Sequence, residues 1–255
     1  MVVLPILVVC GLFAAVLLSI EAGHRVGIRR RSGMPQGPRP VYPAVESSVF
    51  ALMGLLIAFT FYGAGSRFDA RRNLIVREAN AIGTTYLRLD LLPPETQPEL
   101  RQDFRTYVRS RLDVYRKIAD IKALNAALDH SLVLQRSIWR KTVDATKGSG
   151  PAEKSLVLTT LNQMIDITTE QAVALVTHPP PEVFAMLVLM VIAASALVGY
   201  TMSTSAVRDW VSTLVFALTV SIALYVIFDY EFPRVGFIRI DPVDQVLVET
   251  LKQMK

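Results

Sequence analysis

The stretch that decides the fold runs from Tyr42 to Gly65 and reads YPAVESSVFALMGLLIAFTFYGAG. Glu46 is its only charged residue, and a helix of this length crosses the ~30 Å hydrocarbon core of a bilayer. Aromatic side chains lie near its ends, as is common where membrane helices meet water. The stretch therefore predicts a transmembrane helix.

Three more apolar runs have the same character: Val2–Ile20, Val183–Met202 and Trp210–Phe228. The first favours a retained anchor over a signal peptide, because nothing basic precedes it and no small-x-small cleavage site follows it. The whole chain agrees, with 52% hydrophobic residues, 19% charged residues and a mean hydropathy of +0.39. We therefore expect an integral membrane protein with four transmembrane helices.

The pairing of these runs predicts an all-α architecture with four parts. Residues 1–65 hold the first two spans and a short basic loop, and residues 66–181 form a helical extramembrane domain. Residues 182–230 hold spans three and four, and residues 231–255 form a tail with a short amphipathic helix. An even number of spans places both termini and the insert on one side, and we expect the membrane to be the bacterial cytoplasmic membrane.

Charge leaves open which side holds the insert. Positive residues favour the cytoplasmic side of short loops. The two sets of flanking arginines are equal in number: Arg25, Arg29, Arg30, Arg31, Arg39 and Arg208 on one side, and Arg67, Arg71, Arg72, Arg77, Arg234 and Arg239 on the other. The sequence alone therefore does not choose an orientation.

The insert has the period of α-helices throughout. Its first apolar stripe is Phe68, Ile75, Ala79, Ile82, Tyr86 and Leu89, and we expect one nearly continuous helix from Pro43 to Leu92. A second helix from about Glu95 carries Leu100, Phe104, Tyr107, Leu112, Tyr115 and Ala119. Asp129 is predicted to cap a third helix through Leu134, Ile138 and Trp139. A last helix from about Ala152 is predicted to bury Leu158, Leu161, Ile165, Ala172 and Leu175.

Several function classes lack support in the residues. One cysteine and three scattered histidines provide no metal-ligand spacing, and no phosphate-binding loop or nucleophile motif is present. The insert mixes acidic and basic residues, whereas a nucleic-acid surface has a one-sided basic stripe. We therefore expect neither an enzyme nor a cofactor, a metal or a nucleic-acid partner.

A family resemblance lies in the second span and the helix that follows it. It comprises Phe59–Phe61, Arg67–Arg72 and the block EANAIGTTYLRLDLLP from Glu78 to Pro93, with later support from Arg101, Tyr107, Arg111 and Phe237–Pro242. These residues resemble a bacterial family of bestrophin-like membrane proteins. The resemblance implies a homo-oligomeric anion channel with four spans and a helical domain, whose partners are the lipid bilayer, copies of itself and small inorganic ions. A membrane-anchored sensor or scaffold, whose insert binds a ligand or partner, remains the alternative.

Within the channel hypothesis, one face of the second span is a candidate pore lining: Glu46, Phe50, Ile57 and Phe61. The arginines Arg67, Arg71 and Arg72 follow that span and are a candidate vestibule that concentrates anions. Another face carries Ser47, Ala51, Gly54, Ala58 and Gly65, and small residues at this spacing let helices approach closely. Glu46 fits an interfacial anchor as well as the mouth of an ion pathway.

The polar residues of the family block, Glu78, Asn80, Arg88 and Asp90, have no assigned role. Glu78 and Arg88 are too far apart to pair on one helix, so contacts with other helices or subunits are favoured over ligand binding. Asp229 and Glu231, at the end of the fourth span, are too few ligands for calcium and are expected to be solvated at the interface.

Overall fold

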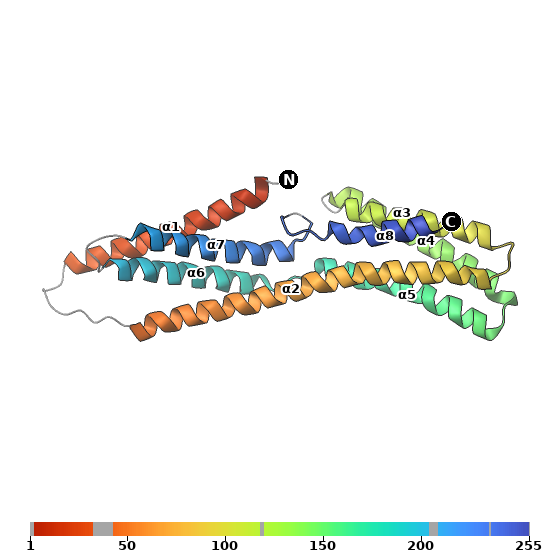
Figure 1. Cartoon of the computed structure of the whole chain (residues 1–255), viewed down its shortest axis with the longest axis horizontal. Helices are drawn as coiled ribbons and strands as arrows, with labels where there is room; N and C mark the ends of the chain where they lie inside the picture. Colours follow the sequence, from red (N-terminus) through yellow and green to blue (C-terminus); the bar gives the residue numbers. More distant parts are fainter. Residues whose placement is uncertain (1–2, 33–42, 118–119, 204–208, 235, 255) are drawn as a thin grey trace. The chain divides into compact units, whose positions relative to one another are not determined.

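The computed structural model describes residues 3–32, 43–117, 120–203, 209–234 and 236–254, and no strand occurs within these ranges. The element order is α1 (Val3–Ser32), α2 (Pro43–Arg88), η1 (Leu89–Leu91), α3 (Gln97–Arg116), α4 (Ile121–Ala145), η2 (Thr146–Gly148), α5 (Pro151–Val176), α6 (Pro181–Met202), α7 (Trp210–Glu231), η3 (Asp241–Asp244) and α8 (Gln245–Gln253) (Figure 1). The all-α prediction is confirmed.

The chain divides into two compact units. Met1–Phe68 and His178–Ile238 form the first, called here the membrane unit. Asp69–Thr177 and Arg239–Lys255 form the second, called here the helical unit. Helix α2 contributes its first part to the membrane unit and its second part to the helical unit.

Four helices in the described part of the chain are long and apolar enough to span a membrane, as predicted. They are α1, the first part of α2, α6 and α7. Helix α1 packs against both α6 and α7. Their shared core is apolar, with Ile20, Leu187, Ala194, Ala217 and Ile227 among its buried members.

Glycines set the distance between α1 and α6. A Cβ at Gly23 would collide with the carbonyl oxygen of Ala196, and one at Gly199 would collide with that of Ile20. The hydroxyl of Ser19 donates to the carbonyl oxygen of Ile192 at 2.7 Å. Small residues and hydroxyl-to-carbonyl bonds hold membrane helices together where lipid provides no hydrophobic drive.

Helix α2 runs unbroken from Pro43 to Arg88, and the short η1 follows it, which confirms the expected continuity across Gly63 and Gly65. The predicted stripe on its second part is buried: Phe68, Ile75, Ala79, Ile82, Tyr86 and Leu89. In the helical unit α3 packs against α4 and α8. Leu100, Phe104 and Tyr107 of α3 are fully buried, as their spacing indicated.

Two expectations within the helical unit are wrong. Asp129 lies inside α4, whose N-cap is Asp120: its carboxylate accepts the backbone N–H groups of Lys122 and Ala123 at 3.0 and 3.1 Å. The buried face of α5 is not the set of apolar residues named from the sequence. It includes Thr160 and Gln171 with Val157, Leu161, Met164 and Ile167, and it leaves Ala172 and Leu175 exposed, because the two polar side chains find hydrogen-bond acceptors inside the unit.

The predicted tail helix is α8, and its Leu247 is fully buried. Arg105 of α3 donates from Nε to the carbonyl oxygen of Met254 at 3.0 Å, next to the end of α8. The tail from Arg239 on therefore belongs to the helical unit, and Leu247 of α8 is part of its core. Of the basic loop residues, Arg39 and Arg208 and the side chain of Arg31 lie outside the described residues.

Candidate functional site

The predicted pore-lining face of α2 lies against other helices of the same membrane unit. The ring of Phe50 meets that of Phe216 edge-on at 6.1 Å, and the ring of Phe61 meets that of Tyr230 at 5.6 Å. Glu46 accepts a hydrogen bond from the hydroxyl of Thr201 at 3.3 Å. These contacts give the face a packing role inside one protomer, and its role in a pathway stays a prediction.

The neighbouring face of α2 is exposed, and so are Leu52, Leu55 and Phe59 beside it. Ser47, Ala51, Gly54 and Ala58 are all exposed, and the larger Tyr62, 76% exposed, continues the row. Only 6% of the apolar window of α2 is buried, against 39% for α7. Among the four spans, α2 is therefore the one that its own chain covers least.

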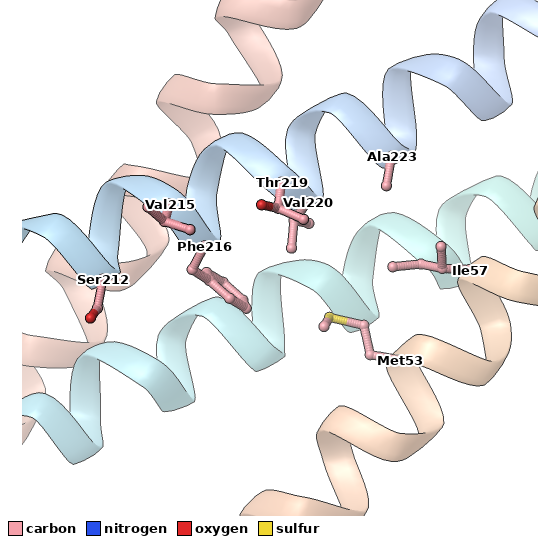
Figure 2. A pocket seen from close by; sticks show the side chains of 8 residues that line it. All are labelled: Met53, Ile57, Ser212, Val215, Phe216, Thr219, Val220 and Ala223. Atoms are coloured by element: carbon pink, nitrogen blue, oxygen red, sulfur yellow. The ribbon is translucent and has the colours of Figure 1, made fainter.

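A hollow of about 580 Å³ separates α2 from part of α7 (Figure 2). It is lined by Met53, Ile57, Ser212, Val215, Phe216, Thr219, Val220 and Ala223. A second hollow of about 370 Å³ lies on α2 near Ala44 and Leu52, with Met190 of α6 in its wall. The membrane part of α2 thus touches the other helices through its larger side chains and leaves space between them.

The predicted vestibule arginines have three different surroundings. Arg67 forms an ion pair with the fully buried carboxylate of Glu231, with Nη2 2.9 Å from Oε2, and His178 Nδ1 lies 3.1 Å from the other oxygen. Arg71 is buried and donates to the carbonyl oxygens of Ala174 and Thr177, both at 3.1 Å.

The guanidinium of Arg71 therefore completes the C-terminal end of α5, where carbonyl groups lack helical partners and the helix dipole favours a cation. Arg72 is half exposed and pairs with Asp69 at 3.5 Å. Of the three predicted arginines, Arg72 is the one whose charge faces solvent.

Glu78, from the family block, lies at the centre of a buried polar network in the helical unit. Its side chain is fully buried. It accepts hydrogen bonds from Arg111 Nε at 2.5 Å, from the hydroxyl of Tyr115 at 2.6 Å and from Gln171 Nε2 at 2.9 Å. Arg111 also donates to the amide oxygen of Gln171. One carboxylate thereby joins α2 to both α3 and α5.

Burial and the charges of this network shift the pKa values of Tyr115, Arg111 and the neighbouring Tyr107. Burial raises the pKa of Tyr115 well above its ordinary range, and the negative charge of Glu78 raises it further. The pKa of Tyr107 is raised by the same two causes in the same order. Burial alone would lower the pKa of Arg111, but Glu78 and the two tyrosines raise it above its ordinary value. Arg111 therefore stays charged and both hydroxyls stay protonated.

The other family-block residues also make mostly interhelical contacts. Arg88 donates from Nη1 to the carbonyl oxygen of Leu156 at 2.6 Å, and Asp90 pairs with Arg101 of α3. Asn80 is exposed. For Glu78, Arg88 and Asp90 the favoured expectation of contacts between helices is confirmed.

The acidic pair at the end of α7 is buried rather than solvated. Asp229 accepts the backbone N–H groups of Phe237 and Ile238, the latter at 2.7 Å, and so closes the turn after the span. Glu231 is the partner of Arg67 and His178. Among the described residues, no group of three or more His, Cys, Asp or Glu is placed to hold a metal ion.

Sequence reasoning missed the partners of Glu78, although a signal existed. Glu78 lies on the buried stripe of α2 between Ile75 and Ile82, and Arg111 lies on that of α3 between Tyr107 and Tyr115. A charge on an apolar stripe has to find an opposite charge or strong hydrogen bonds. Two such charges of opposite sign on two helices of one domain predict a pair.

Solved structures with the same fold are known. Two crystal structures of mutated forms of a bacterial bestrophin homologue from Klebsiella pneumoniae are 15% and 14% identical to this chain. Their TM-scores are 0.70 and 0.65, and the matches cover 94% and 97% of this chain and 97% of each of those chains. A crystal structure described only as a mutated membrane protein is 14% identical, with a TM-score of 0.67, over 94% of this chain and 97% of that one.

The search among curated proteins finds no match. The sequence model of the bestrophin-like domain matches residues 10–245 and so covers three spans completely, most of the first, and most of both units. The all-helical four-span fold agrees with that match. The chain therefore belongs to the bestrophin-like domain family.

Proposed function

We propose that this protein is a homo-oligomeric ion channel whose α2 helices surround the symmetry axis. The observation that carries the proposal is the exposed row Ser47, Ala51, Gly54 and Ala58 on the least covered span. Membership of the bestrophin-like family supports a channel. We further propose the bacterial cytoplasmic membrane as its location and one aqueous compartment for residues 66–181.

Several copies are needed to enclose a pathway for ions. The buried core in the described part of the membrane unit is apolar, so we propose that a single copy does not enclose a water-filled passage. Small side chains on α2 allow copies to approach closely around an axis and still leave a narrow lumen. The pathway that we propose follows Ser47, Ala51 and Ala58, with Tyr62 as the bulkiest side chain in the row. A ring of large, weakly polar side chains is a means of gating by dewetting.

Anions are the ions that we propose. The resemblance to bestrophins supports this choice, and so does the net charge of +5. Arg72 is our candidate for attracting anions, because its side chain is about half exposed even though it pairs with Asp69, whereas Arg71 is buried.

Cysteine accessibility distinguishes the two faces of α2. Cys10 is the chain's single cysteine, so Cys10→Ala provides a background without thiols. In that background, Ala51→Cys, Ala58→Cys and Tyr62→Cys test the exposed row, and Phe50→Cys, Ile57→Cys and Phe61→Cys test the face predicted from the sequence. The measurement is the current of purified protein in planar bilayers before and after a charged, water-soluble thiol reagent.

We expect the reagent to change conductance or anion selectivity at the exposed row and to leave the matched positions unaffected. Block at the Phe50, Ile57 and Phe61 positions alone would restore the pathway predicted from the sequence. The absence of current from the unmodified protein, or a monomer in both mild detergent and lipid, would contradict the channel and leave the membrane-anchored scaffold.

A further inference from the structure

The hollow between α2 and α7 has the chemistry of the bilayer interior. Six of its eight lining side chains come from α7, and Met53 and Ile57 come from α2 (Figure 2). All are apolar except Ser212 and Thr219. The hydroxyl of Ser212 already donates to Asp209, the N-cap of α7. Such a lining suits a saturated or unsaturated hydrocarbon and offers no charged group to an ion.

Its position along α7 matches one leaflet of a membrane. The lining begins at Ser212, two residues after the exposed Trp210 that opens the span, and ends at Ala223. At the rise of an α-helix this is about 16 Å, roughly half of the ~30 Å hydrocarbon core. An exposed tryptophan at a helix end marks the headgroup level. The hollow therefore reaches from one membrane surface to about the bilayer centre.

Beyond Ala223 the two helices close on each other. Tyr230 packs edge-on against both Phe61 and Phe68, at 5.6 and 5.1 Å, and Arg67 pairs with Glu231. A transmembrane helix of a second copy crosses the whole core and is 10–12 Å wide, so it requires a groove along the entire span. A wedge that ends at mid-bilayer fits a single acyl chain instead.

We propose that this hollow is a binding site for one acyl chain of a membrane lipid. The lipid enters from the leaflet on the Trp210 side, with its headgroup near Asp209 and its chain between Phe216 and Ile57. The site goes beyond the proposed channel and does not depend on conduction. The acyl chain would add to the contact between Phe50 and Phe216 by filling the space that remains between α2 and α7.

Photolabelling in lipid tests the site. The full chain is reconstituted in dioleoylphosphatidylcholine vesicles that contain a phosphatidylcholine with a diazirine in the middle of one acyl chain. After irradiation, mass spectrometry maps the adducts. We expect adducts at Met53–Ile57 and Val215–Ala223 severalfold above those at Leu7 and Leu18 of α1, which are exposed in the same unit. The excess should persist after a chase with unlabelled vesicles.

A variant that fills the hollow is compared with a variant that makes the same change on α1. Ala223→Leu places extra volume in the hollow, and Ala15→Leu makes the same change on an exposed position of α1. Ala223→Leu should reduce adducts in the hollow to the level on α1, and Ala15→Leu should leave them unchanged. If Ala223→Leu does not fold, Thr219→Phe is used to fill the hollow instead. The distribution of adducts on the wild-type protein tests the proposal independently of either variant.

Two results would overturn the proposal. Equal labelling of the hollow and of exposed α1 means that only the ordinary lipid shell is present there. Absence of adducts in the hollow, together with cross-links from Met53 to a second copy, means that another protomer covers it.

Discussion

The two units of this chain hold their helices together by different interactions. The membrane unit buries an apolar core and brings α1 and α6 together at Gly23 and Gly199, without a buried ion pair at that contact. The helical unit buries Glu78 and Arg111 at its centre. Lipid offers helices no hydrophobic gain on association, so close contact has to supply the attraction. In the helical unit Phe104 and Leu100 are buried, and a charge pair links α2 to α3.

Helix α2 takes part in both kinds of packing. In the helical unit its Leu74, Ile75, Glu78, Ala79 and Ile82 are buried, whereas most of its membrane part is exposed. Helix α2 is therefore held by many buried contacts at its second part and by few at its first. The next predictions test that contrast, beginning with the strongest contact.

Arg111→Met should lower the stability of the helical unit by about 3–5 kcal/mol, because it leaves the buried carboxylate of Glu78 without its charge partner. The chain offers one tryptophan in each unit, Trp139 in the helical unit and Trp210 in the membrane unit. Denaturant titration of the detergent-solubilised protein, followed in Trp139→Phe and Trp210→Phe backgrounds, reports each unit separately. The Trp139 transition should shift more than the Trp210 transition.

Two further variants test whether burial of the Glu78–Arg111 pair causes this loss of stability. The double variant Glu78→Leu with Arg111→Met removes both charges and should be more stable than Arg111→Met alone. Arg77→Ala removes the exposed partner of Glu170 and should cost no more than about 1 kcal/mol. Equal effects of Arg77→Ala and Arg111→Met would mean that burial of the pair does not matter.

Gly199→Ala should destabilise the membrane unit by about 1–3 kcal/mol, because the added methyl group collides with the carbonyl oxygen of Ile20. The Trp210 transition measures the change. Gly11→Ala is the control, since a Cβ at Gly11 has open space around it. A Gly199→Ala protein as stable as the Gly11→Ala protein would mean that α1 and α6 are farther apart than described here.

Alkaline pH should weaken the helical unit. The folded-state pKa values of Tyr107 and Tyr115 are raised, so unfolded chains lose these protons at a lower pH than folded chains. The stability that they contribute is complete below the ordinary tyrosine pKa of about 10 and is lost as pH rises above it, by at most about 1.4 kcal/mol per pH unit for each tyrosine. The Trp139 transition, measured between about pH 9 and about pH 11, tests this.

Tyr107→Phe should make that slope shallower. Tyr62→Phe, which changes an exposed side chain of the membrane unit, should leave the slope as it is. A slope that does not respond to Tyr107→Phe would place the alkaline sensitivity elsewhere in the chain.

Much of the fold followed from local pattern. The four spans and the stripe from Phe68 to Leu89 are visible in the sequence because apolar residues repeat with the period of a helix. The cap of α4 was misplaced because Asp120 and Asp129 both precede helix-forming residues, and only the hydrogen bonds of Asp120 distinguish them. Gln171 was missed on α5 because an amide is buried only when distant partners accept and donate to it.

The candidate site was harder to predict. Whether Phe50 or Ala51 of α2 faces the rest of the unit depends on Phe216, which is far away in sequence. The same holds for Arg67 and Arg71, which as a sequence cluster resemble a cationic mouth but neutralise Glu231 and the end of α5. Sequence spacing identifies the faces of a helix, but tertiary contacts decide which face is turned inward.

Because helix α2 is unbroken, the number of residues in it fixes the angle around its axis between side chains of its first part and side chains of its second part. Each residue turns the helix by about 100°, so a single residue inserted between Gly65 and Asp69 would rotate the first part of α2 by that angle relative to its second part. Four inserted residues would come back to within about 40° of the original orientation. For this segment the number of residues matters as much as their identity, and insertions and deletions should be tolerated in steps of a helical turn.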